Sequence, residues 1–177
     1  MPIYTKKGDK GTTATINSQG RINKDSQIVQ TLGVIDELNS FLGVAKSFSV
    51  NKTLVKTIAE IQKNLLTIGS ITAGSDLSFS ISETKKLEKT IDRIEAKLPP
   101  LKNFLFPGGG WVGSLLHYCR SLARKAERNM VSLSKFQKVS PSISKYLNRL
   151  SDCLFMLSRE ANFDQGIADE PWFGKKK

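Results

Sequence analysis

Residues 116–128 read LHYCRSLARKAER, and the spacing within this stretch decides the class of fold. Arg120, Arg124 and Arg128 follow one another at intervals of four, so they line one face of an α-helix. Small and apolar residues recur on roughly the opposite side, at Cys119, Leu122, Ala126 and Met130. The stretch therefore predicts a helix that buries one side in a core and presents three guanidinium groups on the other.

The three arginines are unfavourable for the helix itself, because like charges four residues apart repel each other and weaken a helix slightly. Guanidinium groups are planar, permanently charged forks that match the oxygen atoms of phosphate. One interpretation is therefore an anion-binding face. The alternative is an ordinary solvated basic face, as most runs of charge turn out to be.

Four further segments carry the same amphipathic spacing and also favour helices. Together with residues 111–135, the expected helices cover 28–45, 51–68, 80–98 and 140–161. No segment shows the two-residue period of a strand, and no internal repeat divides the chain. Helices of this length with short connections predict an all-α, single-domain, five-helix up-and-down bundle.

Particular residues predict where the helices begin and end. Ser80 with Glu83 fits a capping box, in which each side chain bonds the backbone amide of the other. Ser140 before Pro141 fits an N-cap followed by proline at the first helical position. The proline pair at 99–100 ends the third helix.

The beginning of the chain, residues 1–24, is rich in Gly, Thr, Lys and Asn and shows little periodicity. Residues 5–13 have the composition of an anion-binding loop, although the spacing of a P-loop is absent. Composition alone favours the alternative, a flexible polar terminus. The single domain, 1–177, is thus expected to comprise this loop, a helical bundle at 25–164 and a charged tail at 165–177.

Composition excludes several classes of protein. The longest apolar runs fall short of the roughly 18 residues that a membrane span needs, and no secretory signal is evident, so a cytoplasmic protein is expected. The net charge of +11 and the pI near 9.7 suit nucleic acid, an anionic membrane surface or a polyanionic small molecule. Aromatic residues do not alternate with basic ones, so no nucleic-acid partner is expected. Part of the charge comes from the lysines at 175–177.

Catalysis by a nucleophile and a base has little support. His117 is the only histidine, and Cys119 and Cys153 lie far apart without a C-x-x-C context. No metal site is expected from these residues, and both thiols are expected to be buried and reduced. The chain offers fixed positive charge instead, which suits the positioning of a polyphosphate and the stabilisation of its negative charge.

Two further features lie near the expected core. Asp36 follows the core-facing Ile35. A carboxylate near the core is stabilised by a cationic partner, for which Arg120 is a candidate. The alternative is a carboxylate exposed on the surface. Phe104 and Phe106 precede the fourth helix, and packing is the default for either ring, although Phe104 also suits an apolar ligand.

A polar patch is expected on the fifth helix, where Asn148, Ser151 and Asp152 share one face. Such a patch either meets water or supplies hydrogen bonds to a sugar or a base. The residues alone leave both alternatives open.

Six motifs, in order from Tyr4 to about Arg159, resemble those of the PduO-type ATP:cob(I)alamin adenosyltransferases. They are YTKKGDKG at 4–11, R-x-x-K at 21–24, G-x-x-DELNS at 33–40, F-x-x-PGG at 104–109, LH-x-x-R-x-x-x-RKAER at 116–128 and YLNRLSD at 146–152. Each motif is weak alone, and the ordered set is strong. Lys125 departs from the family pattern, which often has a second arginine there, so weaker nucleotide binding is expected.

The resemblance implies a ferritin-like, cobalamin adenosyltransferase-like bundle with an ordered N-terminal loop, assembled as a homotrimer with ATP between neighbouring subunits. It implies that the triphosphate is wrapped by Thr5, Lys6, Lys7, Gly8, Thr12, Thr13 and Lys24. The other nucleotide-binding residues that it implies are Arg124, Lys125, Glu127, Arg128, Asn148 and Asp152.

The catalytic residues that the resemblance implies are Asp36, Phe104, Arg120 and Arg124. Asp36 and Arg120 would form a salt bridge across the subunit boundary near the cobalamin. Phe104 would press on the lower face of the corrin ring.

The implied reaction transfers the 5′-deoxyadenosyl group of ATP to the cobalt of cob(I)alamin, with Mg²⁺, and releases triphosphate. Implied partners are a flavoprotein reductase and an adenosylcobalamin-dependent acceptor enzyme. Two alternatives remain: a non-catalytic protein that binds ATP or corrinoid for delivery or sensing, and a basic helical protein that binds RNA.

Overall fold

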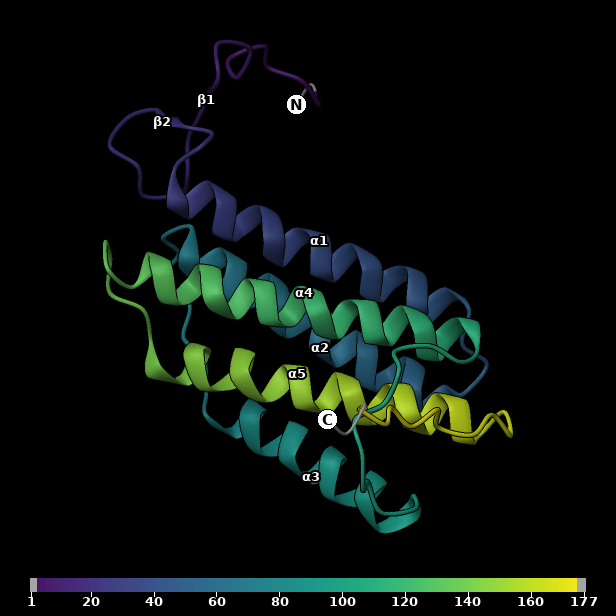
Figure 1. The fold of residues 1–177 in the computed structure, drawn as a ribbon. Helices are drawn as coiled ribbons and strands as arrows, with labels where there is room; N and C mark the ends of the chain where they lie inside the picture. Colours follow the sequence, from purple (N-terminus) through teal and green to yellow (C-terminus); the bar gives the residue numbers. More distant parts are fainter. Residues whose placement is uncertain (1–2, 175–177) are drawn as a thin grey trace.

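The computed structural model describes residues 3–174 and shows a bundle of parallel and antiparallel helices (Figure 1). The helices are α1 (Gln27–Ser47), α2 (Lys52–Thr72), α3 (Ser82–Lys97), α4 (Trp111–Leu133) and α5 (Pro141–Phe163). Successive helices run in opposite directions; α1 contacts α2 and α4, and α5 contacts α4 and α3. Within the described residues, the expected up-and-down bundle of five helices is confirmed.

The core forms where the apolar stripes meet, and α4 shows this most clearly. Its stripe is buried as expected, with at most 4% exposure, at Cys119, Leu122, Ala126 and Met130. Removing a large apolar side chain from water contributes about 1.5–3 kcal/mol, so these stripes fix which side of each helix faces inward. The arginines of α4 are thereby turned outward.

The helix starts follow the sequence in part. Asn51 caps α2, since its side-chain oxygen accepts hydrogen bonds from two backbone amides of the first turn, at 3.0 and 3.1 Å. The capping box at Ser80 is wrong: α3 begins at Ser82, and the Ser80 hydroxyl accepts from the Ser82 amide at 3.1 Å. The Glu83 carboxylate pairs instead with Lys86 at 2.8 Å, because a cation one turn along offers a charge-assisted bond.

At the start of α5, Ser140 occupies the N-cap and Pro141 the first turn, as expected. The serine hydroxyl makes no capping hydrogen bond, and its carbonyl accepts from the Ile143 amide at 3.0 Å instead. Proline at this position removes no hydrogen bond from the helix, because the first backbone amides of a helix have no partner within it.

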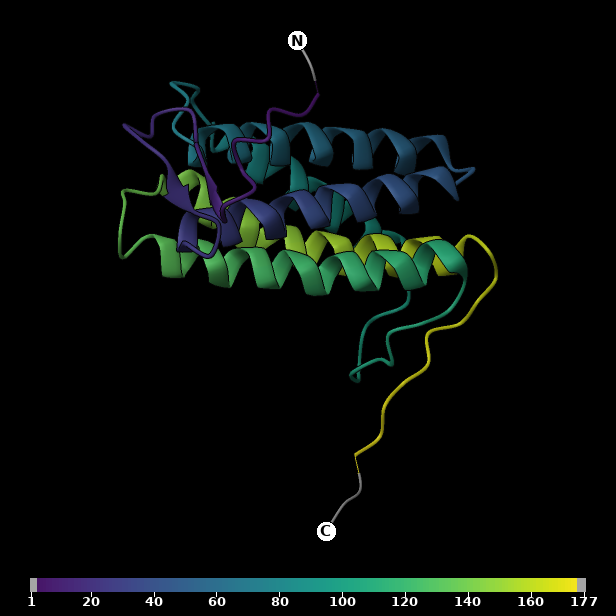
Figure 2. The same ribbon diagram turned by 90° about the horizontal axis from the view of Figure 1, so that it is seen from above.

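The N-terminal loop, residues 3–24 as described, contains two short strands that the sequence did not predict. Strand β1 (Thr12–Thr13) pairs antiparallel with β2 (Ile22–Asn23). A strand of two residues is too short to show a two-residue period, so no pattern in the sequence predicts it. The loop extends from the end of the bundle where α1 begins, on the side of α1 and α2 (Figures 1 and 2).

The connection between α3 and α4, residues 98–110, and the segment that follows α5, residues 165–174, project from the same side of the bundle (Figure 2). The two lie against each other: the Phe106 amide donates to the Glu170 carbonyl at 2.9 Å, and the Trp172 amide donates to the Phe104 carbonyl at 2.7 Å. Part of the expected tail, residues 170–172, is thus paired with a loop; the lysines at 175–177 lie outside the described residues.

Asn162 of α5 bonds the backbone on both sides of Gly109, the middle one of the three consecutive glycines before α4. Its amide nitrogen donates to the Gly108 carbonyl at 3.0 Å, and its oxygen accepts from the Gly110 amide at 3.1 Å. A Cβ atom at Gly109 or Gly113 would collide with this side chain, and Gly109 also has φ 107°. The end of the 98–110 loop is therefore fastened to α5.

Candidate functional site

The arginine face of α4, formed by Arg120, Arg124 and Arg128, borders a hollow in the surface. Arg124 and Arg128 are exposed, and Arg120 is half-buried at the base. Arg120 and Arg124 line a cavity of about 670 Å³ that residues of α3, α5 and the 98–110 loop complete. Two fixed positive charges thus point toward one concave space, as the binding of an anion requires.

Arg120 carries an unused hydrogen-bond donor. Its Nε atom is buried and has no hydrogen-bond partner among residues 3–174. Burial lowers the pKa of its guanidinium, and the positive charge of Arg124 lowers it further. Because a buried donor without an acceptor is costly, an anion in this cavity would be favoured by both the charge and the free N–H group.

Exposed polar groups of α4 and α5 lie beside the arginine face. The Asn148 amide donates to Glu127 at 2.8 Å, which joins two of the expected nucleotide-binding residues. Arg149 donates to Asp152 at 2.8 Å, and both line the cavity of the arginine face. The polar patch on α5 is therefore at the cavity.

The acidic residues of α1 divide between two surroundings. Glu37 pairs with Lys125 at 3.1 Å, which holds that lysine toward α1. Asp36 is exposed and lines a shallow cavity of about 320 Å³ between α1 and α2. Within residues 3–174 no ion pair joins it to Arg120, because Asp36 lies toward α2, whereas Arg120 lies toward α3 and α5; the expected ion pair across a subunit boundary stays a prediction.

The N-terminal loop brings together part of its expected phosphate-binding set. The Lys24 ammonium group lies 3.3 Å from where a Cβ atom of Gly8 would stand. The Lys24 amide donates to the Gly11 carbonyl at 2.9 Å, and Arg21 donates to the side chain and carbonyl of Thr12 at 2.7 and 2.6 Å. Lys6 has a positive φ of 57°, as in a tight turn.

The remaining loop residues of that set are Thr5, Lys7 and Thr13, of which Thr5 and Lys7 are exposed and Thr13 is half-buried. Among the described residues, no hydrogen bond or ion pair connects this loop with the arginine face. The loop leaves the bundle on the side of α1 and α2, whereas the arginine face opens between α3 and α5 (Figures 1 and 2). Within one chain, the N-terminal loop and the arginine face, the two expected nucleotide-binding parts, therefore do not meet.

Phe104 does not pack into the core, so the default expectation of packing is wrong for it. Its side chain is 80% exposed and lies edge-on to Trp172, with ring centroids 6.4 Å apart. Phe104 and Trp172 line an open cavity of about 580 Å³ with Leu101 and Phe173. The loop that carries Phe104 projects from the bundle and is hydrogen-bonded to the 165–174 segment. Phe106 is 48% exposed.

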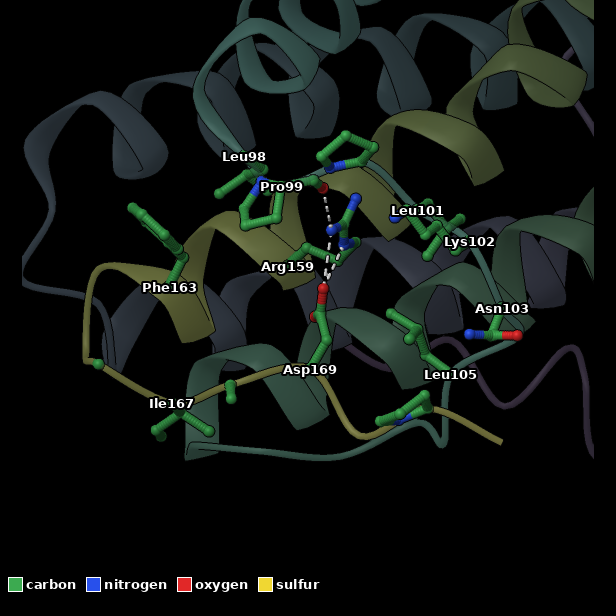
Figure 3. Close-up of a pocket in the computed structure, with 14 residues that line it drawn as sticks. Leu98, Pro99, Leu101, Lys102, Asn103, Leu105, Arg159, Phe163, Ile167 and Asp169 are labelled. Atoms are coloured by element: carbon green, nitrogen blue, oxygen red, sulfur yellow. Dashed lines mark hydrogen bonds and ion pairs between the residues drawn. The ribbon is translucent and has the colours of Figure 1, made fainter. Parts of the chain in front are cut away.

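Sequence reasoning missed Arg159, which lies at the wall between two cavities. It lines both the cavity of the arginine face and a neighbouring cavity of about 640 Å³ (Figure 3). Its side chain is 4% exposed and ion-pairs with Asp169 at 2.7 Å. The signal available in the sequence is the charged pair Arg159–Glu160 inside an otherwise apolar helical stripe.

His117 and the cysteines take no part in this site. His117 is buried in α4, with Ser158 at 3.2 Å and Phe155 edge-on to its ring. Burial lowers its pKa, and so does the charge of Arg120, which favours the neutral ring. Cys119 and Cys153 are free and buried as expected, and burial raises the pKa of each thiol to about 12.

Within residues 3–174, no three His, Cys, Asp or Glu side chains lie close enough together to hold a metal ion. In the same residues, no helix is both long and apolar enough to span a membrane.

Comparisons with known proteins identify the family. A family model for cobalamin adenosyltransferase matches residues 3–161. The corrinoid adenosyltransferase of Bacillus subtilis (strain 168) is 39% identical over 177 residues, covering 96% of this chain and 91% of that protein. The human corrinoid adenosyltransferase MMAB is 38% identical over 176 residues, covering 93% of this chain and 70% of that protein.

Solved structures agree with these relatives. A variant of the PduO-type ATP:corrinoid adenosyltransferase from Lactobacillus reuteri, complexed with cobalamin and ATP, superposes with a TM-score of 0.93 at 34% identity, covering 98% of this chain and 100% of that one. Similarity of sequence and of fold therefore spans nearly the whole chain. The chain belongs to the cobalamin adenosyltransferase family.

Proposed function

We propose that this protein transfers the 5′-deoxyadenosyl group of ATP to the cobalt of a reduced corrinoid, giving adenosylcobalamin and triphosphate. One observation carries the proposal: Arg120 and Arg124 line a cavity in which the buried Nε donor of Arg120 has no partner. A polyphosphate would supply both the charge and the acceptor that this cavity lacks. Membership of the cobalamin adenosyltransferase family supports the identity of the second substrate.

The chemistry explains why one histidine suffices. Cob(I)alamin is a strong nucleophile, and its cobalt attacks C5′ of the ribose: a cobalt–carbon bond forms, and the carbon–oxygen bond to the triphosphate breaks. The electron pair of that bond leaves with the triphosphate, so no proton has to be removed. The protein has to align the two substrates, offset charge on the leaving group and exclude water.

The triphosphate is assigned to the arginine face and to an N-terminal loop from a second copy of the chain. The loop residues are Thr5 to Gly8, Thr12, Thr13 and Lys24, and the residues on the helices are Arg124, Lys125, Glu127, Arg128, Asn148 and Asp152. Their separation in one chain supports a shared site, because neither part alone surrounds a nucleotide. A homotrimer supplies such a site at each of its boundaries.

Asp36 and Arg120 would meet at the same boundary. Asp36 is exposed beside the cavity between α1 and α2, and Arg120 has terminal N–H groups besides its Nε atom, so each has bonding capacity left for another protomer. An ion pair between protomers would bury both groups and bring the α1 surface of one to the arginine face of the next.

Mg²⁺ fits this site as a companion of the nucleotide. It prefers oxygen ligands and is usually held by one or two carboxylates together with phosphates. Glu95 and Asp152 line the cavity, and Glu127 lies beside it, bonded to Asn148; of these carboxylates, Glu127 and Asp152 would hold the ion. When bound, the ion would offset charge on the departing triphosphate.

The corrinoid is assigned to the exposed aromatic surface of Phe104, where the ring would cover the lower face of the corrin. Removal of a lower ligand makes cobalt(II) easier to reduce, which suits delivery of an electron by a flavoprotein reductase. The product would pass to an adenosylcobalamin-dependent enzyme. A cytoplasmic location stays a prediction.

An anaerobic assay tests the proposal. Purified protein, ATP, Mg²⁺ and chemically reduced cobalamin are mixed without oxygen, and the visible spectrum of the corrinoid is followed while triphosphate is measured. We expect the spectrum of adenosylcobalamin and one triphosphate per corrinoid. Binding of ATP and corrinoid without conversion would indicate a delivery or sensor protein, and failure to bind either would contradict the proposal.

A further inference from the structure

Arg159 joins three parts of the chain that are separate in sequence. It lies in the last turns of α5; its Nε atom donates to the Asp169 carboxylate at 2.8 Å, and its Nη2 atom forms an ion pair with the same carboxylate at 2.7 Å. Its Nη2 atom also donates to the carbonyl of Pro99 at 2.9 Å. Figure 3 shows the guanidinium between these two acceptors, with Asp169 on the 165–174 segment and Pro99 at the start of the 98–110 loop.

Burial of the Arg159 guanidinium is favourable only while its anionic partner stays in place, so the ion pair allows little variation in geometry. The Arg159 side chain is 4% exposed, and a buried guanidinium without its anionic partner is strongly unfavourable. Asp169 is 29% exposed and comes from a segment without helix or strand of its own beyond a single bridge. The arginine is fixed by α5, so the ion pair determines where the 165–174 segment lies.

The 165–174 segment in turn determines where Phe104 lies. Phe104 is 80% exposed and has little packing of its own. Its carbonyl accepts from the Trp172 amide at 2.7 Å, its ring lies against Trp172, and Leu105 bridges to Pro171. The contacts that hold this ring therefore come largely from residues that follow Asp169.

We propose that Arg159 is a positioning residue for the transfer reaction. Through Asp169 and Pro99 it clamps the 165–174 segment to the 98–110 loop, and so fixes Phe104 relative to the arginine face, whose cavity Arg159 also lines. This inference rests on the proposed function, because it assigns the corrinoid to Phe104. In this assignment Arg159 acts through its contacts with Asp169 and Pro99 and not as a ligand of either substrate.

The test removes the carboxylate and leaves the buried arginine in place. Asp169→Asn removes the ion pair, and Asp169→Glu restores the charge on a longer side chain. Asp164→Asn is the matched control, because Asp164 is also 29% exposed and loses an ion pair, with Lys97 at 2.5 Å, that holds α3 and not the Phe104 loop. All are made with Trp111→Phe, which leaves Trp172 as the sole tryptophan.

Quenching of Trp172 fluorescence by acrylamide, without substrate, measures the clamp directly. Asp169→Asn should raise the quenching constant, whereas Asp169→Glu and Asp164→Asn should stay near the parent. In the anaerobic assay, Asp169→Asn should lower turnover of reduced corrinoid by roughly ten- to a hundredfold, as misplacement of a positioning group does. Its KM for ATP should change by less than about twofold, since the lost contact is not to the nucleotide.

Unchanged quenching in Asp169→Asn would overturn the clamp. Increased quenching with normal corrinoid turnover would overturn its role in the reaction, and so would an equal loss in Asp164→Asn, which would mark a general loss of stability. Failure of the proposed function is distinguishable, because the parent would then convert no corrinoid while the quenching comparison still reports on the clamp.

Discussion

At the scale of single residues, the spacing within α4 predicts the direction of the three arginines but not the surroundings of each one. The outward direction of Arg120, Arg124 and Arg128 follows from the buried stripe of α4, so the sequence predicts it. The free Nε donor of Arg120 depends on what α3 and α5 leave open beside it. No pattern within α4 contains that information.

Arg124→Ala should lower turnover by roughly a hundred- to a thousandfold, because a fixed donor to the charge developing on the leaving triphosphate is lost. The measurement is the initial rate with saturating reduced corrinoid and varied ATP. Lys56→Ala, which removes an exposed charge from α2, is the control and should keep the parent rate. A near-normal rate for Arg124→Ala would remove this residue from the catalytic set.

The absence of Arg159 from the expected site and the wrong default of packing for Phe104 share a physical reason. Arg159 was expected only as part of an apolar helix, because its partners Asp169 and Pro99 lie outside that helix. Phe104 was expected to pack, since aromatic rings are usually buried. Both errors concern contacts between segments distant along the chain, which the spacing within one segment does not report.

At the scale of elements, an ion-pair cluster holds α3 against α5. The buried Glu160 accepts from Arg93 at 2.7 and 2.9 Å and from Lys97 at 3.3 Å. Burial by itself would raise the pKa of Glu160, but the two cations outweigh burial, so its pKa is lowered from the ordinary 4.5. The charged carboxylate therefore stabilises the fold.

The pH dependence follows from that sign. Because the pKa of Glu160 is lower in the folded state, its contribution is complete above about pH 4.5 and is lost as the pH falls through the lowered value. Glu160→Gln should lower stability near pH 7 by about 1–3 kcal/mol. Thermal unfolding followed by circular dichroism from pH 7 to pH 3 should show a smaller acid loss in the variant; parallel curves would contradict the assignment.

The turn before α4 supports a second test at this scale. Gly109→Ala should destabilise the protein by about 1–3 kcal/mol, because the new methyl group meets Asn162 and the residue has a positive φ. Gly43→Ala is the control within a helix, since its Cβ would make only an ordinary contact with Gln62 at 3.4 Å. That change should stabilise α1 by about 0.5–1 kcal/mol. Urea unfolding of both variants measures the difference, and equal effects would contradict the explanation.

The elements themselves were largely predictable. Long amphipathic stripes predict all the helices of the described chain, because burial of one side is a local property of the sequence. The exceptions are short: the strands β1 and β2, the capping pattern at Ser80 and the pairing of 165–174 with 98–110. In each case, backbone partners or a nearby charge decide the structure, and neither leaves a periodic pattern.

At the scale of the whole molecule, the separation of the N-terminal loop from the arginine face makes the assembly testable. Lys24→Ala should weaken the loop, and Arg124→Ala the arginine face, so each variant alone should be nearly inactive. After the two are unfolded together and refolded, roughly a quarter of the sites in randomly mixed trimers should combine an intact loop with an intact face. Activity should therefore return.

The measurement compares the mixture with each variant refolded alone, with the mass confirmed by light scattering. Recovery of activity in trimers would require that the site is shared. A trimer without recovery would place both parts of the nucleotide site in one protomer. A monomer with parent activity would contradict the proposed assembly itself.

The burial of the two free cysteines has a practical consequence for assays that use a strongly reducing substrate. With a pKa of about 12, almost none of either thiol is ionised at neutral pH, so neither can coordinate cobalt or exchange with added thiols. Iodoacetamide should leave the native protein unlabelled and should modify both cysteines in denaturant, as mass spectrometry would show. Dithionite or thiol reductants can then be varied freely in assays, since both cysteines are free and buried and form no disulfide for these reagents to break.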